Sequence, residues 1–358
     1  MSLIIPTRNR SAVLAETLER IGQHHFGAFH QECELILIDN DSDDAVDPPA
    51  RLSNGIPVRY IRLDHNMNTA ARNVGVEHAS GEWLLMLDDD SAPESGCDWD
   101  LLSDAPEDLG AIGGEIVLPT GIRESGGLPE VIVGCGCVVR RSCFVGLGGY
   151  DASFGYYAEE YDLCAKMIAH GYRVEHNRSL KFLHRKSTLG RDFNEILYRL
   201  VRNNAWVMQR HAPDDCRQVE LDHIMHRYRA IAIKEDAMQG FERACTELEL
   251  TLVDQVRSPM DQVVWDRFTG RAAIRDTLGG IFQNRAGAVS FVGTPHAKGL
   301  EIIASELNRL GCSIVEDGDG VRVVGSLSPG PMLDLAEQYP DAILPWNPRD
   351  GARVSGHP

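Results

Sequence analysis

Positive charge is scarce in this chain of 358 residues. Lysine and arginine together number 35, against 53 aspartate and glutamate residues, so the formal net charge is −18. A surface with this balance repels a phosphate backbone, and nucleic acid is therefore not expected as a partner. A small anion such as a nucleotide remains compatible with the sequence, because one metal ion or one arginine can hold it locally.

Long hydrophobic runs are also missing. The apolar start, Leu3–Ile5, is short and follows no basic region, so we expect no signal peptide, and no run has the roughly 20 residues that span a bilayer. The nine cysteines are scattered, and the one close pair, Cys135 and Cys137, has the spacing of neither a zinc site nor a redox pair. We therefore expect reduced thiols in a cytoplasmic protein.

Glycine-rich phosphate loops do not follow the first strands. The apolar segments Leu3–Pro6 and Leu35–Ile38 predict strands, but neither leads into G-x-G-x-x-G or a P-loop. A dinucleotide fold of that kind and a P-loop enzyme are both disfavoured. Any bound phosphate must then be held by a metal ion and side chains.

An alternation of strands and helices is present instead. Further strands are predicted at Val58–Ile61 and Trp83–Leu87, and helices are predicted after Ser11 and from Thr69 to His78. This order is typical of a mostly parallel α/β sheet covered by helices.

Acidic residues follow two of these strands. Asp88, Asp89 and Asp90 end the fourth strand, and Asp39 ends the second. The carboxyl ends of parallel strands share one edge, where α/β sheets bind ligands. Three adjacent carboxylates repel one another, so a divalent metal carrying a phosphate ligand is one interpretation. Turn and helix-capping chemistry is the other.

A second acidic group stands at the start of a later helix. Glu159, Glu160 and Asp162 occupy its first turn, where carboxylates also favour the helix dipole, so a structural role competes with catalysis. His184 follows an apolar pair, a setting in which a histidine is more often structural than a ligand.

The second half of the chain is predicted to be helical and then α/β again. Apolar periodicity predicts helix from Asp192 to Met238, and further helices reach about Phe282. A strand at Val289–Val292 starts a small α/β unit, in which residues 317–320 predict a hairpin-like turn.

Three arginines of the first predicted helix, Arg199, Arg202 and Arg210, could approach an anionic acceptor or make peripheral contact with a membrane. A solvated helix face is the competing interpretation.

The order and spacing of these motifs resemble family 2 inverting glycosyltransferases of the GT-A fold, within the rhamnosyltransferase-like and galactofuranosyltransferase-like branch. The matching segments are Ile4–Arg10, Asp39–Asp44, Ala71–Gly75, Gly81–Asp90, Gly148–Asp151 with Phe154, Glu159–Leu163, Gly171–Val174 and His184. Two positions depart from the family pattern. Met67-Asn68 stands where a glycine usually precedes A-R-N, and Glu159-Glu160 stands where the family usually has Glu-Asp.

The resemblance covers the chain to about residue 190 and implies the organisation of that part, whereas the parts beyond it are predicted from the sequence pattern alone. A GT-A catalytic domain, with a Rossmann-like and mostly parallel central sheet, would span residues 1–190, with a nucleotide-sugar half at 1–95 and an acceptor half at 96–190. A helical extension at 191–284, a small α/β domain at 285–346 and a disordered tail at 347–358 would follow. The small domain is open between acceptor binding, homo-oligomerisation and a purely structural role.

The resemblance also implies a reaction and its residues. A sugar would pass with inversion from a nucleoside-diphosphate sugar, UDP- or dTDP-linked, to a hydroxyl of a sugar, lipid-linked glycan, peptide or small molecule. Mn²⁺ or Mg²⁺ would be held by Asp88 and Asp90, with His184 as third ligand or diphosphate contact. Glu160 would be the base, with Glu159 and Asp162 holding the acceptor or the helix start. The donor contacts would be Pro6, Thr7, Arg10 and Asp39 at the nucleoside, Asp89 at the ribose, and Arg72 at the acidic rim or the diphosphate.

Two other classes fit part of the pattern. A non-catalytic glycosyltransferase-like scaffold would bind a nucleotide or a partner without transfer, and the intact acidic triplet with Glu160 argues against it. A nucleotidyltransferase would need a glycine-rich basic loop at the first strand, and Pro6–Arg10 has no glycine.

Overall fold

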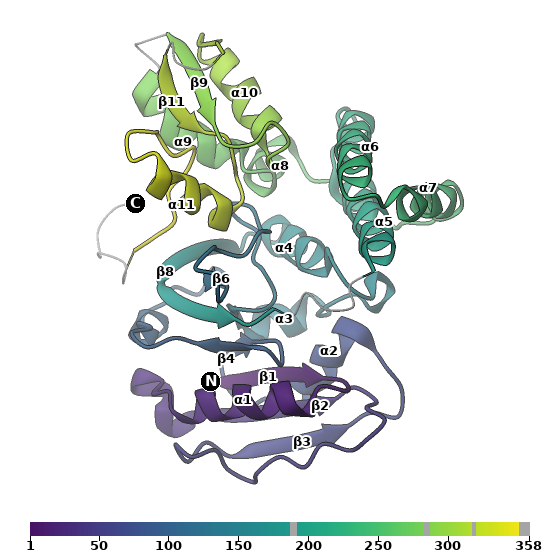
Figure 1. Ribbon diagram of the computed structural model, residues 1–358, viewed down its shortest axis with the longest axis vertical. Helices are drawn as coiled ribbons and strands as arrows, with labels where there is room; N and C mark the ends of the chain where they lie inside the picture. Colours follow the sequence, from purple (N-terminus) through teal and green to yellow (C-terminus); the bar gives the residue numbers. More distant parts are fainter. Residues whose placement is uncertain (187–191, 283–286, 317–319, 351–358) are drawn as a thin grey trace.

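The computed structural model describes residues 1–186, 192–282, 287–316 and 320–350. Figure 1 shows a large sheet domain that carries the amino terminus, helices α5 to α7 projecting to one side, and a small α/β unit at the far end. The predicted order of an α/β region, a helical region and a second, smaller α/β unit is confirmed.

The described part of the large domain is built on an eight-stranded sheet in the order β3-β2-β1-β4-β7-β6-β8-β5. Its strands are β1 (Ser2–Thr7), β2 (Glu34–Asp39), β3 (Val58–Arg62), β4 (Trp83–Met86), β5 (Ser91–Pro93), β6 (Leu109–Val117), β7 (Cys137–Arg140) and β8 (Arg173–His184). β1 runs parallel to β2 and β4, β2 to β3, and β6 to β8, whereas β7 is antiparallel to both of its neighbours. The predicted mostly parallel sheet is confirmed.

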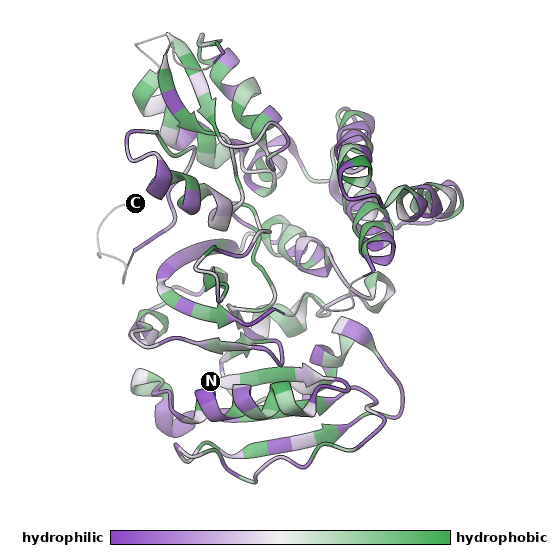
Figure 2. Ribbon diagram, viewed as in Figure 1, coloured by the Kyte–Doolittle hydropathy of each residue, from purple (hydrophilic) through white to green (hydrophobic). Residues whose placement is uncertain are grey.

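Helices cover both faces of this sheet. Leu3 and Ile5 of β1 pack in one apolar cluster with α1 (Ser11–Gly22), and Ile4 packs in the other with α2 (Ala71–Glu77). Because strand side chains alternate between faces, a strand covered on both sides reads as an unbroken apolar run. Figure 2 shows the difference between a strand covered on both sides and a helix with one exposed side. β1 is largely hydrophobic, whereas α1 carries both hydrophobic and hydrophilic residues.

Shorter helices complete the large domain. They are η1 (Gly27–Glu32), η2 (Asn68–Ala70), η3 (Trp99–Leu102), α3 (Arg141–Gly146), η4 (Ala152–Phe154) and α4 (Glu159–Ala169).

The strand register brings the predicted acidic strand ends to one edge. Thr7 pairs with Asp39 across β1 and β2, and Ile4 pairs with Met86 across β1 and β4. Three residues beyond that pair, the Thr7 hydroxyl reaches the carboxylate of Asp89 at 2.8 Å. The ends of β1, β2 and β4 therefore form a common rim.

The helical region consists of separate helices. They are α5 (Phe193–His211), α6 (Arg217–Lys234), α7 (Met238–Thr251), α8 (Gln262–Phe268) and α9 (Arg271–Phe282). The prediction of helix from Asp192 to Met238 is confirmed over most of that range, but the periodicity did not show the break between His211 and Arg217. Ala212 adopts an extended conformation with ψ 139° before Pro213, as the proline ring requires of the residue that precedes it.

The three arginines of α5 are engaged by the protein. Arg199 pairs with Glu195 at 2.7 Å, Arg202 with Glu247 at 3.2 Å, and Arg210 with Asp151 at 2.8 Å. All three side chains are partly buried, so they do not form the solvated face that was the competing interpretation.

The small carboxyl-terminal unit has a parallel sheet in the order β10-β9-β11. Its elements are β9 (Ala288–Val292), α10 (Leu300–Arg309), β10 (Ser313–Ile314), β11 (Val321–Val324) and α11 (Pro329–Gln338). Because β9 lies between β10 and β11, the predicted hairpin between these two strands is wrong. Residues 317–319 of the predicted turn lie outside the described residues.

Ion pairs join this unit to the rest of the chain. Arg275 of α9 binds Glu306 of α10 at 2.7 Å, and Arg123 beyond β6 binds Asp334 of α11 at 2.8 Å. The start of the expected disordered tail runs beside β8, where the Arg349 amide donates to the His176 carbonyl at 2.8 Å. Residues 351–358 of that tail lie outside the described residues.

Within the described ranges, we find no helix that combines the length and the apolar character needed to cross a bilayer.

A glycine contact tests the packing of α5 against α7. A Cβ added at Gly240 would lie 2.1 Å from the backbone oxygen of Asn194, whereas one added at Gly279 of α9 meets nothing within 4 Å. Gly240→Ala is expected to lower the free energy of unfolding by about 1–3 kcal/mol through overpacking. Gly279→Ala is the matched control, and it should be neutral or stabilising by up to about 1 kcal/mol. Urea unfolding measures both, and equal effects would contradict the packing.

Candidate active site

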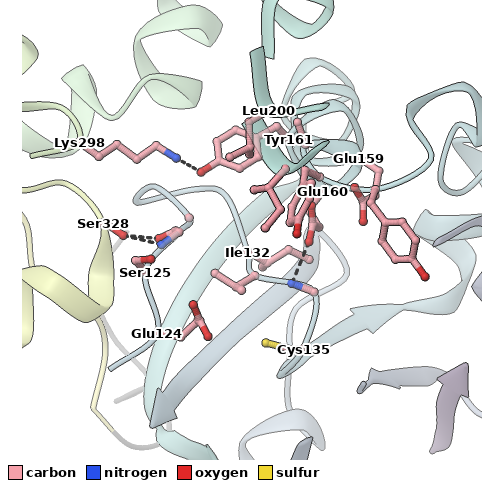
Figure 3. Close-up of a pocket in the computed structure, with 18 of the residues that line it drawn as sticks. Glu124, Ser125, Ile132, Cys135, Glu159, Glu160, Tyr161, Leu200, Lys298 and Ser328 are labelled. Carbon is pink, nitrogen blue, oxygen red and sulfur yellow. Dashed lines mark hydrogen bonds between the residues drawn. The ribbon is translucent and has the colours of Figure 1, made fainter. Parts of the chain in front are cut away.

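One cavity of about 770 Å³ gathers residues from all three parts of the chain. Seven of the twelve residues expected in the site line it: Arg10, Arg72, Asp88, Asp90, Glu159, Glu160 and His184. Pro6, Thr7, Asp39, Asp89 and Asp162 are not among its lining residues. Figure 3 shows how Glu124, Cys135, Glu160 and Lys298 surround this space.

The three aspartates after β4 point in different directions. Asp88 faces the cavity, with 38% of its side chain exposed, and receives a short hydrogen bond from Arg72. The amide of Asp88 donates to Ser91 Oγ at 2.8 Å, which closes the turn. Asp88 is therefore the member of the triplet that is most available to a ligand.

Asp89 turns beneath the end of β1. Thr7 Oγ1 donates to its Oδ2 at 2.8 Å, and Arg10 Nη1 donates to its Oδ1 at 2.6 Å. Burial raises the pKa of Asp89 to about 7, even though Arg10 and Thr7 oppose that shift. The structure does not bring Asp89 into the cavity, where a ribose contact would require it.

Asp90 lies between two cations. Arg10 Nη2 donates to its Oδ2 at 2.6 Å, and His184 Nε2 lies 3.2 Å from its Oδ1. Burial raises the pKa of Asp90, but His184 and Arg10 outweigh it and hold that pKa well below its usual range. Its Oδ1 is buried and faces only the His184 ring among the described residues, so a cation at this oxygen would replace the ion pair with His184.

His184 reaches the site because β8 ends beside β5, where it pairs with Ser91. Its Nδ1 lies 2.9 Å from Glu124 Oε2 and 3.5 Å from Cys135 Sγ. Burial lowers the pKa of His184, but contacts with Asp90, Cys135 and Glu124 outweigh it and raise this pKa to about 12. Glu124 also binds Lys186 at 2.6 Å, so the histidine stands in a buried network of opposite charges.

The donor atoms here fit a divalent cation. Ligand atoms of Asp88, Cys135 and His184 lie within 4.8 Å of one another. A carboxylate suits Mg²⁺ and Mn²⁺, and an imidazole favours the transition metal of the two. His184 would have to release a proton to bind the ion. Asp90 lies beside His184 but outside this group of three, so the geometry favours Asp88 over Asp90 as the first carboxylate ligand.

The side chain of Asp39 stabilises the turn that follows β2. Its Oδ1 accepts from the Ser42 amide at 2.9 Å, and its Oδ2 accepts from Tyr60 at 2.8 Å. Burial raises the pKa of Asp39, but these hydrogen bonds outweigh it and lower that pKa. Asp39 therefore shapes the rim of the sheet at the end of β2. Pro6 lies near the end of the neighbouring strand β1, at the same rim.

Arg72 links the two acidic groups of the site. It is buried on α2, donates to the Leu87 carbonyl at 3.2 Å and pairs with Asp88. Its charge also acts on Glu159 and Glu160 across the cavity.

The turn η2, which leads into α2, begins at Asn68, whose φ of 53° is left-handed. Asparagine tolerates this conformation, so it takes the place of the glycine that the family pattern usually has here.

Glu159 and Glu160 form a buried pair at the start of α4. The Gly134 amide donates to Glu160 Oε1 at 3.2 Å, and Glu159 Oε2 is buried without a hydrogen-bond partner. Burial raises the pKa of both groups, and the charge of Glu160 adds to the shift of Glu159. A carboxylate with a raised pKa is a stronger base near neutral pH.

The loop before α4 has a strained backbone, and hydrogen bonds from α5 hold it in place. Tyr157 and Ala158 have φ values of 70° and 66°, a left-handed conformation that costs energy for such residues. Asn203 of α5 donates to the carbonyls of Phe154, Tyr156 and Tyr157 at 2.6–3.0 Å. The helical extension thus fixes the glutamate pair.

Asp162 points away from the cavity. It is buried, and His211 at 2.9 Å, Lys166 at 2.6 Å and Arg210 at 3.2 Å surround its carboxylate. This network ties α4 to α5, so the structure does not bring Asp162 to the acceptor side of the cavity.

Glu124, Cys135 and Lys298 are among the lining residues that were not predicted as site residues. Glu124 and Cys135 lie in the connection between β6 and β7, and Lys298 lies in the carboxyl-terminal unit. No motif marks Glu124 or Lys298. The Cys135–Cys137 pair was visible in the sequence, but its place beside His184 depends on the sheet order.

A parallel sheet with an acidic, cation-balanced strand end and a facing carboxylate pair defines the class: the fold is a GT-A fold. Residues 2–122 match the family described as Glycosyl transferase family 2. In the solved structures, GalNAc-T7 with UDP, GalNAc and Mn²⁺ has a TM-score of 0.50 and 14% identity, covering 71% of this chain and 57% of that one.

Two curated relatives resemble the amino-terminal region. The chain is 36% identical over 91 residues to the uncharacterized glycosyltransferase YwdF of Bacillus subtilis (strain 168), covering 25% of this chain and 32% of that protein. It is 37% identical over 91 residues to an uncharacterized glycosyltransferase of Haemophilus influenzae, covering 25% and 29%. The aligned region spans about a third of the length of these relatives.

The glutamate pair predicts how stability changes with pH. A carboxyl whose pKa is raised on folding contributes its full stability below the unfolded value, 4.5 for Glu159, and loses it as pH rises. Glu159→Gln should therefore unfold at a higher temperature than the wild type at pH 8, by a margin that shrinks towards pH 4. The margin for one proton changes by at most about 1.4 kcal/mol per pH unit. Thermal unfolding across this range measures it, and a margin that grows on acidification would contradict the burial of the pair.

Proposed function

We propose that the protein is an inverting glycosyltransferase that uses a divalent metal and moves a sugar from a nucleoside-diphosphate sugar, UDP- or dTDP-linked, to a hydroxyl acceptor. One observation carries the proposal: Asp88 and His184 line the same cavity as the buried pair Glu159 and Glu160. A site for a leaving diphosphate and a site for a base thus share one space. The family match of residues 2–122 supports the same activity.

The proposed roles of the residues follow from their charges. Asp88 and His184 would hold Mn²⁺ or Mg²⁺, with Asp90 beside them. Burial raises the pKa of the neighbouring Cys135 thiol to about 11, and such a thiol is a poor ligand for these ions. A bound cation of this kind stabilises the negative charge that develops on a departing diphosphate. Arg10 and Arg72 orient the carboxylates, and both line the cavity near the place that the diphosphate would take.

Glu160 is the proposed base. Inversion needs a base on the face opposite the leaving group, close enough to take the proton of the acceptor hydroxyl. Glu160 lines the cavity, is less deeply buried than Glu159, and keeps one oxygen free of the Gly134 amide. Burial raises the pKa of Glu160, and Glu159 then holds the helix start.

Glu160→Gln tests the base. We expect sugar transfer to fall by about 10²–10⁴-fold, because general-base catalysis contributes that much, while affinity for nucleoside diphosphate stays unchanged. Glu249→Gln, an exposed position on α7, is the matched control and should transfer normally. Turnover of Glu160→Gln at the wild-type rate would rule out this role.

Asp88→Asn tests the metal site. Calorimetric titration with UDP or dTDP should show binding that depends on manganese in the wild type and is weakened at least about tenfold in the variant. Asp44→Asn changes an exposed acidic residue of another strand-end turn and should bind as the wild type does. Equal affinity in Asp88→Asn would remove Asp88 from the site. A wild type that responds to no nucleotide would favour the scaffold.

A further inference from the structure

The cavity continues beyond Glu160 into a region that the family match does not cover. Its far wall holds Tyr161 of α4, Arg227 and Tyr228 of α6, and Lys298 of the carboxyl-terminal unit. Figure 3 shows Lys298 extending from that unit towards the Tyr161 hydroxyl, with Glu160 beside it. Three parts of the chain therefore meet at this end of the cavity.

The carboxyl-terminal sheet points its ligand-binding edge at this wall. In the parallel order β10-β9-β11, β10 lies on one side of β9 and β11 on the other, so the strand order reverses between β9 and β11. Ligands of α/β sheets bind outside the carboxyl ends of the strands at such a point. The residues that follow β9 and β11 line the cavity: Thr294, Ala297, Lys298, Ser326 and Ser328. The edge that usually binds ligands is thus turned towards Glu160.

Among the residues that the structure describes, neither of two cations on this wall forms an ion pair with a carboxylate. Lys298 contacts the Tyr161 hydroxyl and lies 4.2 Å from the centre of its ring, and among the described residues no acid lies within ion-pair distance of it. Arg227 has a buried Nε without a hydrogen-bond partner, and its guanidinium lies 5.6 Å from the ring of Tyr228. Burial and the nearby charge of Arg227 lower the pKa of Lys298 well below its ordinary value.

The other cations that line the cavity are paired. Arg10 binds Asp89 and Asp90, Arg72 binds Asp88, and Lys186 binds Glu124. Two neighbouring, half-buried cations without a counter-charge repel each other, and a bound anion would relieve this repulsion. The chain as a whole carries −18 and does not attract anions in general, so the effect is local to this wall.

We propose that Arg227 and Lys298 bind a phosphate group of the acceptor and thereby present the acceptor hydroxyl to Glu160. This inference rests on the proposed transferase function and names its acceptor class: a phosphate ester or phosphodiester. Arg227 binds the oxygens through its planar guanidinium, and Lys298 binds them as a point charge. Tyr161 holds the ammonium in position, and the carboxyl-terminal unit becomes part of the acceptor site.

Calorimetry with glycerol 3-phosphate tests the site, with glycerol as the uncharged control. The donor site is first filled with UDP and Mn²⁺, so that phosphate cannot bind there. The wild type should bind glycerol 3-phosphate and not glycerol, and Arg227→Met and Lys298→Met should each bind at least about tenfold more weakly. Arg229→Met, an exposed position on the same helix, is the matched control and should bind as the wild type does.

Folding is checked separately. Arg227→Lys keeps the charge and should recover part of the affinity, which a merely misfolded cavity would not. Binding that is equal in the wild type and both methionine variants overturns the proposal, and so does a wild type that binds no glycerol 3-phosphate once UDP is bound.

The two proposals fail in different ways. If UDP with Mn²⁺ binds and glycerol 3-phosphate does not, the acceptor proposal fails while the donor site stands. If phosphate binding depends on Arg227 and Lys298 but no nucleotide binds, the anion site stands and the transferase function fails. Vesicles of phosphatidylcholine with and without phosphatidic acid identify the source of the phosphate. Vesicle binding that both methionine variants weaken indicates a lipid-borne phosphate, and phosphate binding without vesicle binding indicates a water-soluble ester.

Discussion

Three adjacent carboxylates at the end of one buried strand repel one another, and the architecture of the site follows from their neutralisation. Arg10 comes from the loop before α1, Arg72 from α2 and His184 from the end of β8, so the cations arrive from three separate elements. Each of these cations binds a different carboxylate, or a different oxygen of the same carboxylate. The result is that Asp89 is fixed under the sheet, Asp90 is shared, and Asp88 alone keeps a substantial exposed surface.

The same electrostatics separates the two acidic groups of the cavity. Arg72 neutralises Asp88 and also acts on Glu159 and Glu160, which lack a cation of their own within ion-pair distance among the described residues. Asp90 is strongly paired, so its pKa lies well below its usual range, whereas burial with little compensation raises the pKa of Glu160. Carboxylates in one cavity thus acquire different pKa values from their surroundings, which is the condition for the different roles proposed for them.

Sequence reasoning succeeded where local pattern and strand order determine position. The apolar runs of β1, β2 and β4 predicted a mostly parallel sheet, and Asp88 with Glu160 could be expected at its edge. It failed for acidic side chains that have several polar neighbours, because the sequence does not show which of these neighbours a carboxylate will bind. Asp89 and Asp162 are close in sequence to cavity residues and Asp39 ends a neighbouring strand, but each of the three binds a donor outside the cavity. The apolar periodicity also did not show the break between α5 and α6, which covers only residues 212–216.

Lys298 marks the limit of that reasoning and explains why the small domain matters. It lies 138 positions beyond Glu160 in a segment with no recognisable motif, and its partner Tyr161 reads as an ordinary helix residue. The ion pair of Arg123 with Asp334 and the close approach of Gly330 to Glu124 hold α11 against the large domain and so support this contact. If the proposed function is correct, a unit docked beside the cavity with its strand ends facing inward would determine which acceptors can reach Glu160.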